Sequence, residues 1–87
     1  MSHQTETDIR EAFYTGVYTG EWTLAETVRQ MRKVARMTQV EYARFVGIAP
    51  RIVIDLERGV GNPTLKSLEK LAQPFGLTVN FSHKDRT

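Results

Sequence analysis

Residues 38–59 read TQVEYARFVGIAPRIVIDLERG, and this stretch decides the fold. Thr38 and Glu41 have the T-x-x-E spacing of a capping box, which predicts that a short helix begins here. Gly47 suits the left-handed residue that follows a helix end, and Pro50 is tolerated in the first turn of a next helix. Two short helices joined by about three residues are typical of a helix-turn-helix.

Further helices are predicted on both sides of this pair. The same T-x-x-E spacing at Thr23 and Glu26 precedes apolar residues at helical intervals, which predicts a helix from Leu24. Thr64 is the expected cap of a last helix that stops at residues 74–76.

The two ends of the chain are less regular. In residues 1–22, Ile9 and its apolar neighbours predict one or two helical turns, with Gly16 and Gly20 loosening the connection. Residues 77–82 alternate apolar and polar side chains, which predicts a β-strand. A lone strand needs a partner, so we expect it to pair with the same strand of a second subunit. The alternative is an extended tail that packs on its own subunit.

The expected fold class is therefore all-α, a compact four- to five-helix domain with a short C-terminal strand. We expect an N-terminal extension (1–22), a helix-turn-helix domain (23–76) and a dimerisation segment (77–87). The residues predicted to form the dimer contact are Leu77, Val79 and Phe81.

Composition excludes several classes of function. The chain has 87 residues and no cysteine, which rules out disulfides and thiolate metal sites. Its two histidines, His3 and His83, lie near opposite ends, so we predict no metal site, no cofactor and no enzyme. It contains no apolar run of the roughly 18 residues that a membrane helix needs, and its first residues lack a signal-peptide pattern. We therefore expect a cytoplasmic protein without a membrane partner.

Charge is unevenly distributed along the chain. The formal balance is −4 over residues 1–26, +4 over 27–60 and +2 over 61–87. A basic body suggests a polyanion as partner. The alternative is scattered surface charge that only keeps a small domain soluble.

Three spaced motifs together resemble a known family. They are T-Q-x-x-x-A-x-x-x-G-I at 38–48, V-x-x-L-E-x-G at 53–59 and N-P-x-L-x-x-L-x-x-L-A at 62–72. This pattern, from about residue 24 to 77, resembles the Cro/Xre-type helix-turn-helix of phage repressors and bacterial regulators. The resemblance implies a DNA-binding domain, usually a homodimer, whose third helix enters the major groove of double-stranded DNA.

The resemblance also implies roles for single residues. Thr38 and Gln39 would contact backbone phosphates, as the amides of a helix N-terminus favour. Arg51 would read guanine, while Asp55 would accept from cytosine or orient Arg51 one turn away. Arg32 and Glu57 match a family pair that bridges two helices and are predicted to be structural. The predicted DNA-contacting residues are Thr38, Gln39, Arg44, Pro50, Arg51, Ile52, Asp55, Arg58 and Lys66.

Apolar and aromatic residues leave alternatives open. Ile52 is interpreted as a contact for thymine methyls, whereas Ile54 and Phe45 are expected to pack under the N-terminal extension. Trp22, with Tyr14 and Tyr18, is interpreted as core packing, the alternative being an interaction patch. The arginines and lysine of residues 29–36 are divided between structure, solvent and one phosphate contact.

The predicted function is a dimeric repressor that binds a palindromic operator without any catalytic step. The alternative is an antitoxin that binds its toxin protein and represses its own operon, which the acidic first 26 residues and the terminal strand keep open.

Overall fold

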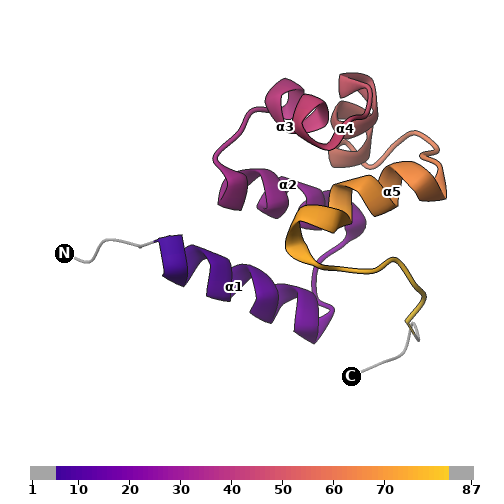
Figure 1. Cartoon of the computed structure of the whole chain (residues 1–87). Coiled ribbons are helices and arrows are strands. Elements are labelled where there is room, and N and C mark those ends of the chain that lie inside the picture. Colours follow the sequence, from indigo (N-terminus) through magenta and orange to yellow (C-terminus); the bar gives the residue numbers. More distant parts are fainter. Residues whose placement is uncertain (1–5, 83–87) are drawn as a thin grey trace.

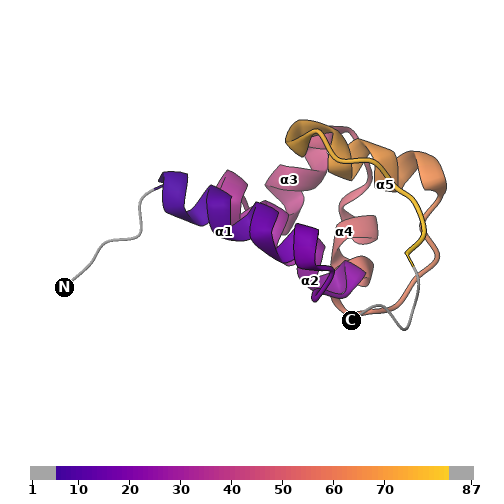
Figure 2. The same ribbon diagram turned by 90° about the horizontal axis from the view of Figure 1, so that it is seen from below.

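The computed structural model describes residues 6–82, which form five α-helices and one 3-10 turn. In chain order these are α1 (Glu6–Thr19), α2 (Leu24–Ala35), α3 (Gln39–Val46), α4 (Pro50–Glu57), α5 (Leu65–Ala72) and η1 (Gln73–Phe75). In Figure 1, α2 lies between α1 on one side and the α3–α4 pair on the other, with α5 beside them. Figure 2 views the same arrangement from the α1 side. Within the described range, every helix is too short or too polar to cross a bilayer.

Threonine caps begin α3 and α5 as predicted. The Thr38 hydroxyl accepts from the Glu41 amide at 3.1 Å, and the Glu41 carboxylate accepts from the Thr38 amide at 2.9 Å. This reciprocal pair is the expected capping box, which satisfies two amides that have no partner inside the helix. At α5, the Thr64 hydroxyl accepts from the Ser67 amide at 3.1 Å.

The box predicted at the start of α2 is only half present. The Thr23 hydroxyl accepts from the Glu26 amide at 3.1 Å, as expected. The Glu26 carboxylate, however, accepts from Arg29 and Gln30, both at 2.7 Å. A charged guanidinium is a stronger partner for a carboxylate than a backbone amide is, so the reciprocal half of this prediction was wrong.

The turn between α3 and α4 forms the predicted helix-turn-helix. Gly47 adopts a left-handed conformation (φ 83°) at the end of α3. The amides of Gly47 and Ile48 both donate to the Ala43 carbonyl at 2.9 Å, which closes the helix end. Pro50 is the first residue of α4. Ala43 and Val53 are fully buried where the two helices cross, so the crossing requires small or well-fitted side chains.

A single hydrophobic core joins the helices. Tyr42 lies at its centre, fully buried, and its hydroxyl donates to the Leu71 carbonyl at 2.8 Å. The hydrogen bond satisfies the one polar atom of this side chain and links α3 to the last turn of α5. The core residues are Phe13, Val28, Met31, Tyr42, Ala43, Val53, Leu56, Leu71 and Phe75.

The N-terminal segment forms one helix of 14 residues, not the one or two loose turns expected. Phe13 is buried in the core, and the Tyr14 hydroxyl donates to the Phe75 carbonyl at 2.9 Å. A glycine inside a helix normally destabilises it by about 1 kcal/mol. Here the Trp22 ring lies against Gly16, where a methyl group would be 2.4 Å from ring carbons. Close packing therefore explains a glycine that looked like a helix breaker.

Residues 77–82 form no strand in the described part of the chain, so the strand prediction was wrong. No second extended segment lies beside them in this range, and an unpaired strand cannot satisfy its backbone groups. Leu77 instead packs against the core, and its amide donates to the Ala72 carbonyl at 3.2 Å. Val79 is partly exposed and Phe81 fully exposed. The alternation of apolar and polar residues therefore belongs to a segment that packs on the core at Leu77 and is exposed further on.

Two further packing predictions need correction. Phe45, expected under the N-terminal extension, is exposed, because α1 lies on the far side of α2 from α3 (Figure 1). Ile54 is only half-buried and is not among the residues that pack on the core. Trp22 packs against the core, as interpreted from the sequence. Tyr18 is exposed, so the same interpretation was wrong for this residue.

Candidate nucleic-acid interface

α4 has one buried face and one face that carries an ion pair. Val53 and Leu56 are buried on the inner side. On the outer side, Arg51 Nη1 lies 3.7 Å from Asp55 Oδ1, one helical turn away. The Arg51 side chain is 71% exposed and that of Asp55 29% exposed. The guanidinium therefore remains accessible, and guanidinium groups bind guanine edges or phosphate through paired N–H donors.

Other predicted contact residues on α4 are less accessible. Pro50 and Ile52 are half-buried, and Ile52 packs against the core. Only part of the Ile52 side chain is left for the predicted contact with a thymine methyl group.

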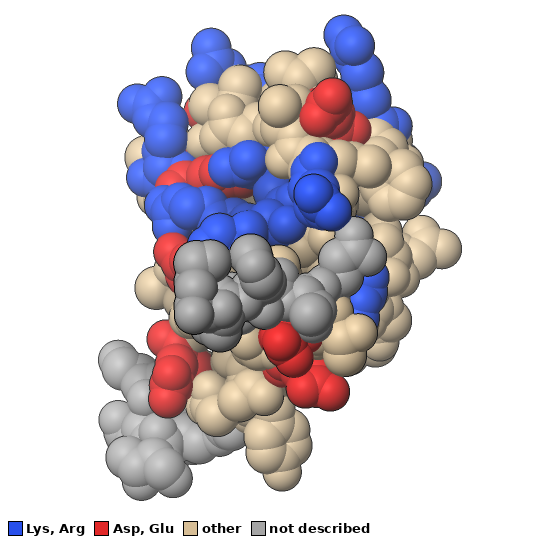
Figure 3. All heavy atoms as spheres, turned by 90° about the vertical axis from the view of Figure 1, so that its left-hand side faces the viewer, with Lys and Arg blue, Asp and Glu red and all other residues tan. Residues whose placement is uncertain are grey.

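Further exposed positive side chains lie on the elements that neighbour α4 in sequence or in the fold. The exposed ones predicted to touch DNA come from α3, from the residue after α4 and from α5: Arg44, Arg58 and Lys66. Figure 3 shows the lysines and arginines of the visible face gathered mainly on its upper half, which is the α2 and α3 side of Figure 1. The lower half, on the α1 side, carries acidic side chains and few basic ones. The charge asymmetry along the sequence is therefore also an asymmetry in space.

The two residues at the start of α3 have partners within the domain. The Thr38 hydroxyl is engaged in the capping box. Gln39, predicted as a phosphate contact, is half-buried, and its Nε2 donates to Glu57 Oε1 at 3.2 Å. The structure therefore places the Gln39 amide against the end of α4.

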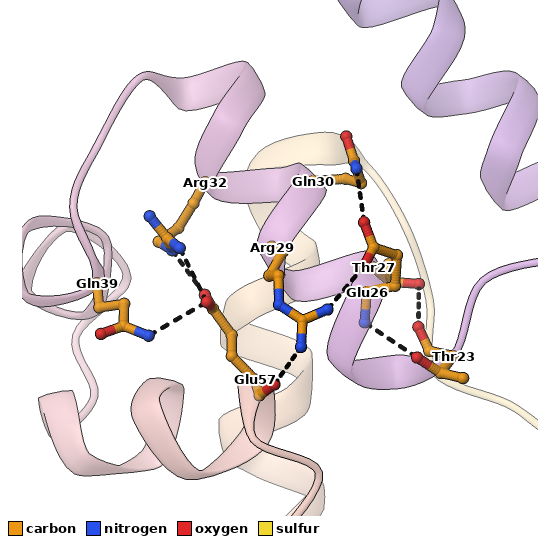
Figure 4. Close-up of polar contacts among 8 residues, drawn as sticks. All are labelled: Thr23, Glu26, Thr27, Arg29, Gln30, Arg32, Gln39 and Glu57. Carbon is orange, nitrogen blue, oxygen red and sulfur yellow. Dashed lines mark hydrogen bonds and ion pairs between the residues drawn. The ribbon is translucent and has the colours of Figure 1, made fainter.

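Glu57 is the centre of a polar network that joins three helices (Figure 4). Only 5% of the residue is exposed. Arg32 donates to it through Nε at 2.6 Å and through Nη2 at 2.8 Å, a two-pronged pairing between α2 and α4. Arg29 also donates to the Glu57 main-chain carbonyl. The predicted pair is thus in direct contact, and Gln39 adds α3 to it.

The network keeps both charged groups ionised. Burial alone would raise the pKa of Glu57, but hydrogen bonds from Arg32 and Gln39 and the nearby positive charge outweigh it, so this pKa lies below its ordinary value of 4.5. The hydrogen bond to Glu57 likewise raises the pKa of Arg32. Every buried side-chain nitrogen and oxygen in the described residues has a hydrogen-bond partner. The orientation of α4 relative to α2 and α3 is therefore held by a fully paired carboxylate.

Sequence reasoning missed two members of this network. It assigned Gln39 to DNA, and it placed Arg29 in a group shared between structure, solvent and one phosphate contact without giving it a role of its own. One available signal was spacing, because Arg29 precedes Arg32 by three residues and so lies on the same face of α2. No comparable local signal marked Gln39, whose partner is 18 residues away.

A capped helix, a glycine turn and a second helix with an exposed arginine on its outer face define a helix-turn-helix domain. A family model described as helix-turn-helix matches residues 28–81, which is more than half of the chain. The chain belongs to the Cro/Xre-type helix-turn-helix family.

Curated relatives agree with this membership. The chain is 31% identical over 58 residues to the immunity repressor protein of Bacillus phage phi105, covering 67% of this chain and 40% of that protein. It is 35% identical over 57 residues to the HTH-type transcriptional regulator DdrOP3 of Deinococcus deserti, covering 66% and 44%. An uncharacterized HTH-type transcriptional regulator of Archaeoglobus fulgidus is 35% identical over 52 residues, covering 60% and 73%. The matches thus span less than half of the first two relatives. No solved structure matches significantly.

Proposed function

We propose that this chain is a sequence-specific DNA-binding regulator whose α4 enters the major groove. The observation that carries the proposal is the outer face of α4, where the Arg51 guanidinium is exposed beside Asp55. Relatives named as a repressor and as transcriptional regulators support it. The chain would act as a repressor by occupying its operator, with no catalytic step and no cofactor.

The proposed division of labour follows from chemistry. Arg51 donates two hydrogen bonds to O6 and N7 of a guanine and so reads sequence. Arg44, Arg58 and Lys66 neutralise phosphates, which adds affinity without sequence information. The Glu57 network keeps α4 at a fixed angle while these contacts form.

A second subunit is proposed to bind through the segment after η1. Phe81 is fully exposed and Val79 partly exposed, next to an apolar groove of about 420 Å³ between α2, α5 and this segment. Two copies related by a two-fold axis would bury these side chains and present two α4 helices to a palindromic operator. Half-sites would then lie ~34 Å apart, one turn of duplex. Leu77 already packs within its own subunit and contributes little to the contact.

DNA binding is tested by selecting bound sequences from a random pool and measuring affinity for the selected site. If each subunit neutralises about three phosphates, the slope of log K against log salt is roughly −5 for the dimer. Arg51→Ala should relax the preference at one base pair. Lys66→Ala, the control, should weaken all sequences nearly alike. Absence of duplex binding at low salt, or an unchanged preference in Arg51→Ala, would contradict the proposal.

The dimer is tested separately by sedimentation. Phe81→Ser should convert a dimer to a monomer. The helical content should not change, because the Phe81 side chain is fully exposed within its own subunit. A variant that remains dimeric shows that the interface lies elsewhere.

An antitoxin remains a second candidate because exposed aromatic side chains also lie away from α4. Tyr18 is exposed on α1, on the far side of α2 from α3 and α4 (Figure 1). A toxin bound there would leave the α4 face available for DNA. A toxin gene beside this one, and a complex that Tyr18→Ala weakens without affecting DNA binding, would support this candidate.

A further inference from the structure

The loop after α4 packs against Asp55. The Val60 amide donates to the Asp55 carbonyl at 2.9 Å, and the Gly59 amide donates to the Leu56 carbonyl at 3.0 Å. These backbone bonds hold the loop to the last turn of α4 whatever side chains it carries. The loop continues so close to α4 that a methyl group on Gly61 would lie 3.0 Å from Asp55 Cβ and 3.7 Å from its Oδ2.

The Asp55 carboxylate is therefore confined on one side by the loop and faces Arg51 on the other. A small hollow of about 140 Å³ lies between α4, the loop and the start of α5, and Asp55 lines it together with Arg51 and Gly61. This confinement agrees with the lower exposure of Asp55 compared with Arg51.

We propose that Gly61 is a specificity-determining position, because it sets the place of Asp55, and Asp55 in turn sets the direction of the Arg51 guanidinium. The inference rests on the proposed function, in which Arg51 reads a base. It makes Asp55 and Gly61 positioning residues that need not touch DNA themselves.

The physical reason is the flexibility of arginine. A free arginine side chain carries about 2 kcal/mol of rotamer entropy, and a bidentate contact with guanine requires one orientation of its plane. An ion pair at one helical turn restricts that side chain before DNA arrives. At a separation of 3.7 Å the guanidinium is paired with Asp55, and it is still exposed enough to contact a base. A shift of Asp55 by a few tenths of an ångström would change the geometry of this ion pair and hence the orientation of the Arg51 guanidinium.

The chain offers a matched control for the test. Gly59 and Gly61 both have left-handed backbones (φ 75° and 90°), so alanine strains either one. A methyl group on Gly59 meets no atom within 4 Å, whereas one on Gly61 meets Asp55. Gly59→Ala therefore reproduces the strain without the displacement.

The experiment compares Gly61→Ala, Gly59→Ala, Asp55→Asn and Arg51→Ala in the full chain. For each variant, affinity is measured for the selected operator and for its single-base substitutions, together with thermal unfolding. Gly61→Ala and Asp55→Asn should lose discrimination at the same base pair as Arg51→Ala, by up to the roughly 5- to 150-fold expected for a bidentate contact. Gly59→Ala should retain the wild-type preference.

Epistasis separates positioning from direct reading. When Arg51 is already alanine, adding Asp55→Asn or Gly61→Ala should change discrimination less than twofold. A loss of discrimination from Asp55→Asn in that background would show that Asp55 reads a base directly and would overturn the inference. It is also overturned if a folded Gly61→Ala, or Asp55→Asn, keeps the wild-type preference while Arg51→Ala loses it. Should Gly61→Ala fail to fold, Asp55→Asn still tests whether the Asp55 carboxylate sets the direction of Arg51. An unchanged preference in Arg51→Ala would instead refute the proposed reader.

Discussion

Replacing Glu57 with glutamine should destabilise the protein by about 3 kcal/mol. Removing one partner of a buried ion pair costs roughly 3–5 kcal/mol because the other charge is left uncompensated. Glu57 is almost fully buried, but the Arg32 side chain is 26% exposed, which places the expected value at the lower end. For a domain of this size, about 3 kcal/mol lowers Tm by roughly 12–24 °C.

Glu26→Gln is the matched control. Glu26 also pairs with an arginine, at 2.7 Å from Arg29, but both side chains are more than one third exposed. Exposed pairs contribute about 1 kcal/mol or less, so this variant should unfold close to the wild type.

Because of the Glu57 carboxylate, we expect the stability of the fold to depend on pH. Because the pKa of Glu57 is depressed in the folded protein, its ionisation stabilises the fold fully above its ordinary pKa of 4.5. This contribution is lost as the pH falls through the lower pKa of the folded state. Glu57→Gln should lack this part of the acid destabilisation, while Glu26→Gln should keep it.

Thermal and urea unfolding from pH 7 to pH 3 measures all of these effects. The reasoning is refuted if Glu57→Gln unfolds within about 1 kcal/mol of the wild type at pH 7, since the pair would then behave as a solvated one. It is also refuted if the two glutamine variants are equally destabilised.

Three other substitutions test the packing, each by thermal unfolding. Gly16→Ala should lower stability by about 1–3 kcal/mol despite the better helix propensity of alanine, because the methyl group overlaps the Trp22 ring; a higher Tm would contradict this contact. Tyr42→Phe should remove about 1–2 kcal/mol by leaving the buried Leu71 carbonyl without its donor, and an unchanged Tm would show that the carbonyl finds another partner. Thr38→Ala should remove about 1 kcal/mol through loss of the α3 cap, whereas a serine there should retain most of it.

Much of the fold was predictable because its signals are local. The cap at Thr38, the turn at Gly47 and the proline at the start of α4 each act within a few residues, so the sequence displays them directly. The length of α1 was not predictable in this way. Whether Gly16 breaks a helix or permits close packing depends on Trp22, which lies after the end of that helix.

The errors at the surface have a related cause. Alternation in residues 77–82 indicates side chains on two faces, but it does not show whether a neighbouring strand exists. Phe45 was expected to pack under the N-terminal extension. It is exposed because α1 covers the side of α2 that faces away from α3, which the sequence does not show.

The candidate site was predictable in part. The positions of Arg51 and Asp55 one turn apart follow from helical spacing alone. The pairing of Arg32 with Glu57 was expected from the family resemblance. The hydrogen bond from Gln39 and the contact of Gly61 with Asp55 depend on the angles between segments, which no local pattern encodes.

The order in which the helices pack has a consequence for how the molecule assembles. α3 packs on α4 and α1 on α2, which are neighbours along the chain, and α2 packs on α4 across only one intervening helix. Contacts between near neighbours form without closing long loops, so chains of this type collapse and fold in about microseconds to milliseconds. We expect the α2–α4 unit to form as one nucleus and the hydrogen bond from Tyr14 to Phe75, across 61 residues, to form later. A transient opening at α1 would therefore break few of the contacts among α2, α3 and α4, although it would expose the side of the core that Phe13 fills.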